Sequence, residues 1–102
     1  MTRHALRAVL LLALAAGAAR ADEIVTIKNF DFAPMAVTVK AGTTVTWRND
    51  DEEPHTVVSQ DGLFRSAAID GGEHFSFKFD KPGTYKYVCT IHPRMVGTIV
   101  VK

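Results

Sequence analysis

Residues 83–101 read GTYKYVCTIHPRMVGTIVV and contain two strand-like runs on either side of a short loop. Tyr85, Tyr87 and Cys89 alternate along the first run, and residues 96–101 form the second run. Alternation of this kind, with many β-branched and aromatic residues, is typical of half-buried strands. The stretch therefore predicts two strands joined by a loop that begins at Cys89.

The same alternation recurs upstream, in runs broken by glycine, proline and aspartate. A β-branched run at residues 24–27 is continued at period two by Phe30 and Phe32, and residues 60–70 are either a loop or a distorted edge strand. Six to eight short strands predict an all-β protein, an antiparallel sandwich or barrel. The remaining runs lie at residues 35–40, 43–47, 55–59 and 74–79.

Aromatic residues are expected to form the core, because the alternation already accounts for them. Either Tyr85 or Tyr87 is expected to bond back to the backbone at a strand corner. The residues concerned are Trp47, Phe75, Phe77, Phe79, Tyr85 and Tyr87.

The first 21 residues have the order of a secretory signal peptide. A basic start precedes an apolar run at residues 8–19, and Ala19-Arg20-Ala21 is an A-x-A cleavage site. The apolar run is shorter than the ~20 residues that a membrane span needs. We expect cleavage after Ala21, export to the periplasm and one mature domain at residues 22–102. An uncleaved amphipathic helix is the alternative.

Composition excludes several classes of protein. The chain has 102 residues, a net charge of +1 and a single cysteine. An internal disulfide and a Cys₄ metal site are excluded, and the charge, which falls to −2 without residues 1–21, gives no basic surface for nucleic acid. Small exported domains usually carry disulfides or a metal, so a metal is the expected stabilising element.

Cys89, His92 and Met95 form a C-x-x-H-x-x-M pattern in the loop between two strands. His55 lies at another strand boundary, which a sandwich can bring to the same end. One thiolate, two imidazoles and a thioether are the donors of a blue-copper site, and zinc seldom binds methionine. Each residue alone has an ordinary structural explanation, but together they predict one copper ion that cycles between Cu(I) and Cu(II).

The histidine count argues against an enzyme. Downstream of residue 21 the sequence has three histidines, and His74 is the one not assigned to the metal; it lies on the polar face of its run, so we expect it at the surface. Copper oxidases and reductases that contain a blue-copper site use a second copper centre with several histidines. The chain is therefore expected to be an electron carrier.

Asp50-Asp51-Glu52-Glu53 is the one clear run of charge. It directly precedes Pro54-His55. Such a run is either a solvated loop or an acidic rim that steers a basic redox partner toward the site.

Residues 23–102 resemble the cupredoxins, the family of plastocyanin, pseudoazurin and amicyanin. The motifs are W-R-N at 47–49, P-H at 54–55, G-T-Y-K-Y-V-C at 83–89 and the ligand loop, whose two short spacings look most like amicyanin. The resemblance implies a Greek-key β-sandwich with His55, Cys89, His92 and Met95 as ligands of one type 1 copper ion.

The resemblance also implies which residues surround the ligands. Asn49 would bridge the two ligand loops, with its side chain bonding near Thr90 and its backbone N–H meeting the Cys89 sulfur. Pro54 and Pro93, beside the two histidines, belong to the same surroundings. Electrons would pass through the solvent-facing edge of His92.

The leading hypothesis is a monomeric periplasmic blue copper protein that shuttles single electrons between redox proteins, such as a c-type cytochrome or a periplasmic dehydrogenase. A copper trafficking or storage protein without redox turnover is the alternative. A copper-free interaction module is a third possibility, and an enzyme ranks last. No nucleic acid and no membrane span are expected.

Overall fold

The computed structural model describes residues 22–102 and contains eight strands. The signal peptide predicted for residues 1–21 lies outside the described residues. Within the described part of the chain, no helix is long and apolar enough to cross a membrane. The strands are β1 (Asp22–Lys28), β2 (Asp31–Ala33), β3 (Ala36–Val39), β4 (Thr43–Asn49), β5 (Val58–Ser59), β6 (His74–Phe79), β7 (Gly83–Val88) and β8 (Val96–Val101).

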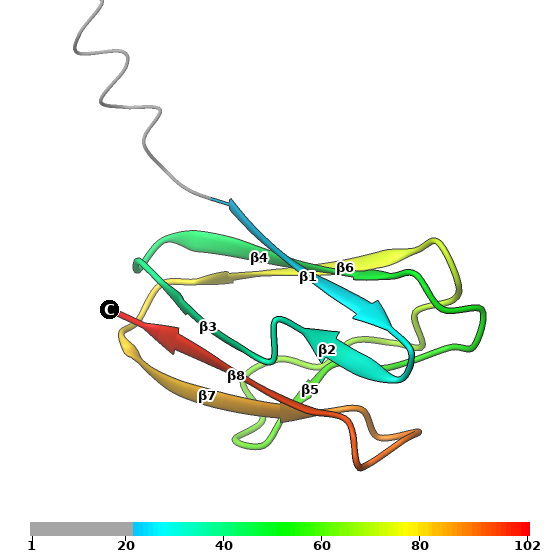
Figure 1. Cartoon of the computed structure of the whole chain (residues 1–102). Helices are drawn as coiled ribbons and strands as arrows, with labels where there is room; N and C mark the ends of the chain where they lie inside the picture. The colour runs from blue at the N-terminus through cyan, green and yellow to red at the C-terminus, as the bar shows by residue number, and fades with distance from the viewer. Residues whose placement is uncertain (1–21) are drawn as a thin grey trace, which may run out of the picture.

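The strands form two four-stranded sheets that pack as a sandwich (Figure 1). One sheet has the order β2-β1-β4-β6 and the other the order β3-β8-β7-β5. The predicted all-β sandwich is confirmed, with one difference: β1 pairs with β4, and β3 with β8, in parallel. After β2 the chain crosses to the other sheet for β3 and returns for β4. Strands joined through such a crossover can pair in parallel, which a hairpin cannot.

Aromatic side chains fill the space between the sheets, as the alternation predicts. Trp47 is fully buried, and its ring packs against that of Tyr87 with centroids 5.3 Å apart. Phe79 is also buried, while Phe75 and Phe77 are partly buried and pack against the core. These side chains are therefore packing residues.

The predicted strand at residues 55–59 is shorter in the structure, where only Val58–Ser59 pairs as β5. Residues 55–57 follow a different path because their polar groups bond elsewhere. The Thr56 N–H, for example, donates to the Cys89 sulfur at 3.4 Å instead of joining a ladder.

Residues 60–70 form a loop, the first of the two structures considered for them. The loop folds back along residues 55–58, and an isolated bridge pairs His55 with Ile69. It also adds Phe64 to the core, where the side chain is 4% exposed. The loop is therefore held in place near the end of the sandwich that carries His55.

The two tyrosines of β7 differ in role. Tyr85 makes the predicted corner, because its hydroxyl donates to the Lys81 carbonyl oxygen at 2.7 Å. Tyr87 is fully buried and lies over Gly97, the residue opposite it on β8. A side chain at position 97 would occupy the space that the tyrosine ring fills.

We expect Gly97→Ala to destabilise the fold. The added Cβ would collide with the Tyr87 ring, which is enclosed by the core. Overpacking of this kind costs about 1–3 kcal/mol. Urea unfolding should show that loss, whereas Thr98→Ala, on the opposite face of β8, should unfold close to the wild-type midpoint. Equal midpoints for Gly97→Ala and wild type would contradict the packing.

Candidate metal centre

The four predicted ligands come from two loops at one end of the sandwich. His55 lies in the loop that follows β4, and Cys89 comes directly after β7. His92 and Met95 lie in the loop between β7 and β8. Figure 1 shows both loops, with the β1–β2 turn, at the end of the sandwich opposite the C-terminus. Strands of fixed length and register thus bring distant residues to one place.

The donor atoms of His55, Cys89 and His92 converge. The Nδ1 atoms of both histidines lie 3.8 Å from the Cys89 sulfur, and the three ligand atoms are all within 4.8 Å of one another. His55 and Cys89 are fully buried, whereas His92 is partly exposed. One ion can therefore contact all three donors while one histidine edge faces solvent.

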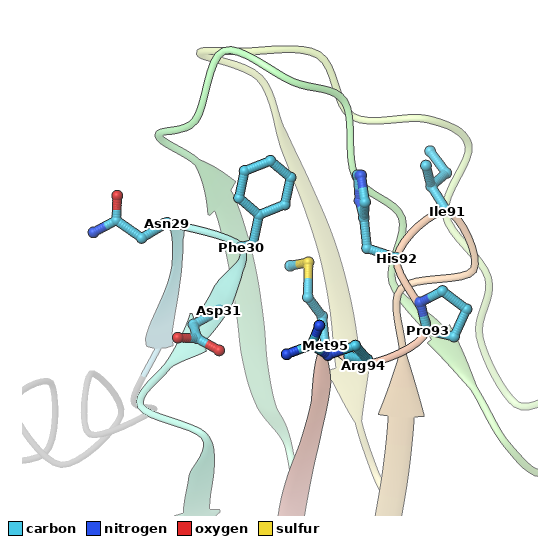
Figure 2. Close-up of a pocket in the computed structure, with 8 residues that line it drawn as sticks. All are labelled: Asn29, Phe30, Asp31, Ile91, His92, Pro93, Arg94 and Met95. Atoms are coloured by element: carbon cyan, nitrogen blue, oxygen red, sulfur yellow. The ribbon is translucent and has the colours of Figure 1, made fainter.

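Met95 lies beside these three residues. It is 2% exposed and lines a surface pocket of about 510 Å³ together with His92 and Phe30 (Figure 2). Its N–H donates to the His92 carbonyl at 2.9 Å, and its carbonyl accepts from the Cys89 N–H at 3.0 Å. These bonds close the ligand loop into a compact turn and place the fourth donor near the other three.

The electrostatics of the site favour a thiolate. Burial raises the pKa of Cys89, but the Thr56 N–H and the groups of His55 and His92 that face the sulfur lower it to about 6, from an ordinary value of 9.0. The lowered pKa favours the thiolate over the thiol at neutral pH. The thiolate is the form of cysteine that binds metal ions.

Thr56, and not Asn49, links the two ligand loops. Its hydroxyl accepts from the Thr90 N–H at 2.8 Å and lies 2.8 Å from the Thr90 hydroxyl. Its own N–H donates to the Cys89 sulfur. We expected Asn49 to make these contacts, and that expectation is wrong, because the Asn49 N–H donates to the Glu73 carbonyl. The place of Thr56 in the sequence was the available signal: Thr56 directly follows the predicted ligand His55, so its backbone lies close to the metal site.

Asn49 instead organises the loop that carries His55. Its side-chain amide donates to the Glu53 and Ile69 carbonyls at 2.8 and 2.9 Å, and its carbonyl oxygen accepts from the Asp51 N–H at 2.9 Å. The side chain is fully buried, so these bonds satisfy its polar atoms. Asn49 thus holds the loop that carries His55, and its side chain makes no hydrogen bond to the Cys89 sulfur.

Asp51 contacts His55 directly, which sequence reasoning missed. Its Oδ2 lies 2.9 Å from His55 Nε2, and its two oxygens accept the N–H groups of Asn29 and Phe30. Burial raises the pKa of Asp51, but the two backbone bonds and His55 outweigh it, so the pKa is lowered. An ionised carboxylate only accepts, so Nε2 carries the hydrogen and leaves Nδ1 to face the metal position.

Phe30 was expected to extend the first strand, and that expectation is wrong. Asn29 and Phe30 form the turn between β1 and β2, with φ of 55° and 59°. The turn directs the Phe30 ring at the histidines, with centroids 5.3 Å from His55 and 4.9 Å from His92. Asn29 was the available signal, because asparagine tolerates the left-handed region.

The other predicted residues lie as follows. Thr90 is exposed but its backbone and hydroxyl bond to Thr56. Pro54 and Pro93 are exposed beside the histidines, and Pro93 lines the same pocket as Met95. His74 is exposed on β6 and is outside the metal-binding cluster.

The donor set fits one copper ion. Two imidazoles and a thiolate surround a single point, and a buried thioether lies close by. Such a His₂Cys arrangement with a weak methionine ligand is characteristic of blue copper, whereas structural zinc sites are closed by four nitrogen, sulfur or oxygen donors. The residues that converge here are those a type 1 copper site requires.

We expect the Thr56 hydroxyl to stabilise the metal-free protein. Thr56→Val leaves the Thr90 N–H without its acceptor, and an unsatisfied group of this kind costs about 1–3 kcal/mol. Thr56→Ser keeps the hydroxyl and should recover most of that loss. Urea unfolding without metal measures both, and equal stabilities for the two variants would contradict a role for the hydroxyl.

Comparisons with known proteins agree with this site. Residues 3–101 match the family model described as a cupredoxin-like domain. Amicyanin-alpha of Methylorubrum extorquens is 38% identical over 102 residues, with 88% of this chain and 86% of that protein covered. A purple cupredoxin from Nitrosopumilus maritimus has a TM-score of 0.73 at 34% identity, covering 79% of this chain and all of that one.

A solved amicyanin variant, a methionine-to-alanine substitution in its Cu(I) form, is also similar. Its TM-score is 0.77 at 33% identity, with 86% of this chain and 89% of that chain covered. The family model spans most of the sequence, and the relatives share both the fold and about a third of their residues. The chain belongs to the cupredoxin-like family.

Proposed function

We propose that this protein is an exported electron carrier that holds one copper ion through His55, Cys89, His92 and Met95. Thiolate and thioether donors stabilise Cu(I), and imidazoles accommodate Cu(II). A copper ion bound there would supply one-electron redox chemistry, and the chain would supply a fixed donor geometry. We include in the proposal that residues 1–21 are removed and that residues 22–102 act in the periplasm as one domain.

The observation that carries this proposal is the equal approach of two histidine Nδ1 atoms to one buried thiolate, both at 3.8 Å. The donors are held by bonds within the chain: His55 by Asp51, and Cys89 by Thr56. A site whose donors are held in place changes little when the charge on the ion changes. Small rearrangement is what rapid electron transfer needs.

The partly exposed His92 supports a path for electrons at this end of the molecule. Phe30 and Ile91 are exposed by 43% and 46%, and Pro93 is exposed between the histidine and Arg94. We propose that redox proteins, such as a c-type cytochrome or a periplasmic dehydrogenase, dock on this rim. Contact here would bring a partner close to the copper without exposing the thiolate.

We expect residues 22–102 to turn blue when Cu(II) is added. Visible absorption should show an intense band that depends on the Cys89 thiolate, and EPR should show small copper hyperfine splitting. Cys89→Ala should lose the band. Reversible oxidation and reduction would support the carrier, whereas a colourless protein that binds Cu(I) or Zn(II) tightly would indicate trafficking or storage.

The fold places the four acids of residues 50–53 in different surroundings. Asp51 is buried, and Asp50 pairs with Arg48 at 3.2 Å. Only Glu52 and Glu53 are exposed acids of this run without an ion pair among residues 22–102. An acidic rim that steers a partner would therefore consist of these two residues.

We expect the double variant Glu52→Gln and Glu53→Gln to bind a basic c-type cytochrome more slowly at low salt. Loss of two steering charges should lower the association rate roughly two- to tenfold, and less at high salt. Stopped-flow mixing measures the rate. The matched control is Asp22→Asn with Asp61→Asn, two exposed acids without an ion pair among residues 22–102. Equal rates in both double variants would refute steering by this rim.

A further inference from the structure

One carboxylate joins two segments of the chain that are far apart in sequence. Oδ1 of Asp51 accepts the Asn29 N–H at 2.7 Å, and Oδ2 accepts the Phe30 N–H at 2.9 Å. The same Oδ2 lies 2.9 Å from Nε2 of His55. Asp51 is 9% exposed, so these bonds form largely out of water. The position of the β1–β2 turn is thereby coupled to that of a copper ligand.

The turn itself has a conformation that its sequence does not favour. A two-residue hairpin with φ above zero at both positions normally has asparagine followed by glycine. Here the second residue is Phe30, with φ of 59°. A bulky residue in this region is strained, and such strain persists only where the surroundings hold it. The two N–H bonds to Asp51 are what hold it.

The strained residue lies over the metal site. The Phe30 ring is edge-on to both histidines, at interplanar angles of 87° to His55 and 86° to His92. Phe30 also lines the pocket that reaches His92 and Met95 (Figure 2). At 43% exposure, one part of the side chain faces solvent while the rest covers the imidazoles. A glycine at position 30 would adopt this φ without strain, but it would leave the two imidazoles without the ring that covers them.

We propose that Asp51 and Phe30 act together as a clasp that positions His55 and His92 and slows the loss of copper. Asp51 is a positioning residue for His55 and holds the turn. Phe30 restricts the movement of both imidazoles and excludes water from their edges. The inference rests on the proposed copper function, but the positions of the histidine rings can be tested without metal.

Two variants of Phe30 distinguish the loss of the clasp from a general loss of stability. Phe30→Gly removes the ring and also relieves the strained φ, so the metal-free protein should unfold at the same or a higher temperature. If the ring holds the histidines, the same variant should lose copper faster. Phe30→Tyr keeps the ring and should restore the wild-type rate. Leu63→Ala is the control, because Leu63 is a similarly exposed apolar side chain in the residue 60–70 loop.

Asp51 has a matched control in its neighbour. Asp51→Asn and Asp50→Asn each remove one negative charge from the same loop. Asp50, however, is exposed and pairs with Arg48 rather than with a histidine. An effect confined to Asp51→Asn therefore reports the bonds to His55 and the turn, and not the change of charge.

Two measurements test the proposal. The first is the rate at which the copper-loaded protein passes Cu(I) to an excess of chelator. We expect Asp51→Asn and Phe30→Gly both to release copper faster, Asp51→Asn by about 10–100-fold, the range by which metal affinity falls when a hydrogen-bonding partner of a ligand is removed. The second is NMR of the metal-free protein, in which Phe30→Gly should weaken the NOEs between the His55 and His92 rings, whose centroids lie 5.0 Å apart, and Asp51→Asn should speed exchange of the His55 Nε2–H.

Each outcome decides one part of the proposal. An unchanged release rate in Phe30→Gly overturns the role of the ring, and equal rates in Asp51→Asn and Asp50→Asn overturn the role of Asp51. Faster release that merely follows a lower unfolding temperature would also contradict the clasp. If the wild type binds no copper, the proposed function fails, while the NMR measurements still decide whether Asp51 and Phe30 position the two rings.

Discussion

The site depends on keeping one negatively charged sulfur atom buried. A buried charge is costly unless other groups compensate it. Cys89 is fully buried, and the Thr56 N–H and both histidine rings face its sulfur. Loops from different strands must meet there to supply these groups. The two sheets therefore serve mainly to hold their loop ends in one arrangement around the thiolate.

The surroundings of the ligands extend this arrangement outward. Asn49 fixes the loop that carries His55, and Asp51 orients the imidazole itself. Partners of this kind keep the correct ring nitrogen toward the metal position. A small domain without a disulfide can hold such a site because its core of aromatic side chains is continuous beneath it. Rigid donors, in turn, suit an ion that changes charge without changing position.

Three side chains near the ligands show why contacts are harder to predict than donors. The acidic run at residues 50–53 contains four similar side chains, yet only Asp51 turns inward. Thr56, rather than Asn49, reaches the sulfur, because it follows His55 into the site. Phe30 leaves the strand pattern at a left-handed turn. In each case at least one of the deciding contacts joins residues that are more than 20 positions apart, as with Asp51 and Phe30.

The sequence by itself determined most of the strands, the aromatic core and the four residues that we propose as copper donors. Alternation along a strand and the short spacing of the donors are local properties of the sequence, so they can be recognised without the tertiary structure. Only the tertiary structure decided that two strand pairs are parallel, which N–H meets the Cys89 sulfur, which acid orients His55 and where the Phe30 ring lies. Those features arise where loops from separate strands come together. The physical reason is that the distances between such loops depend on the packing of the whole sandwich, which no local pattern encodes.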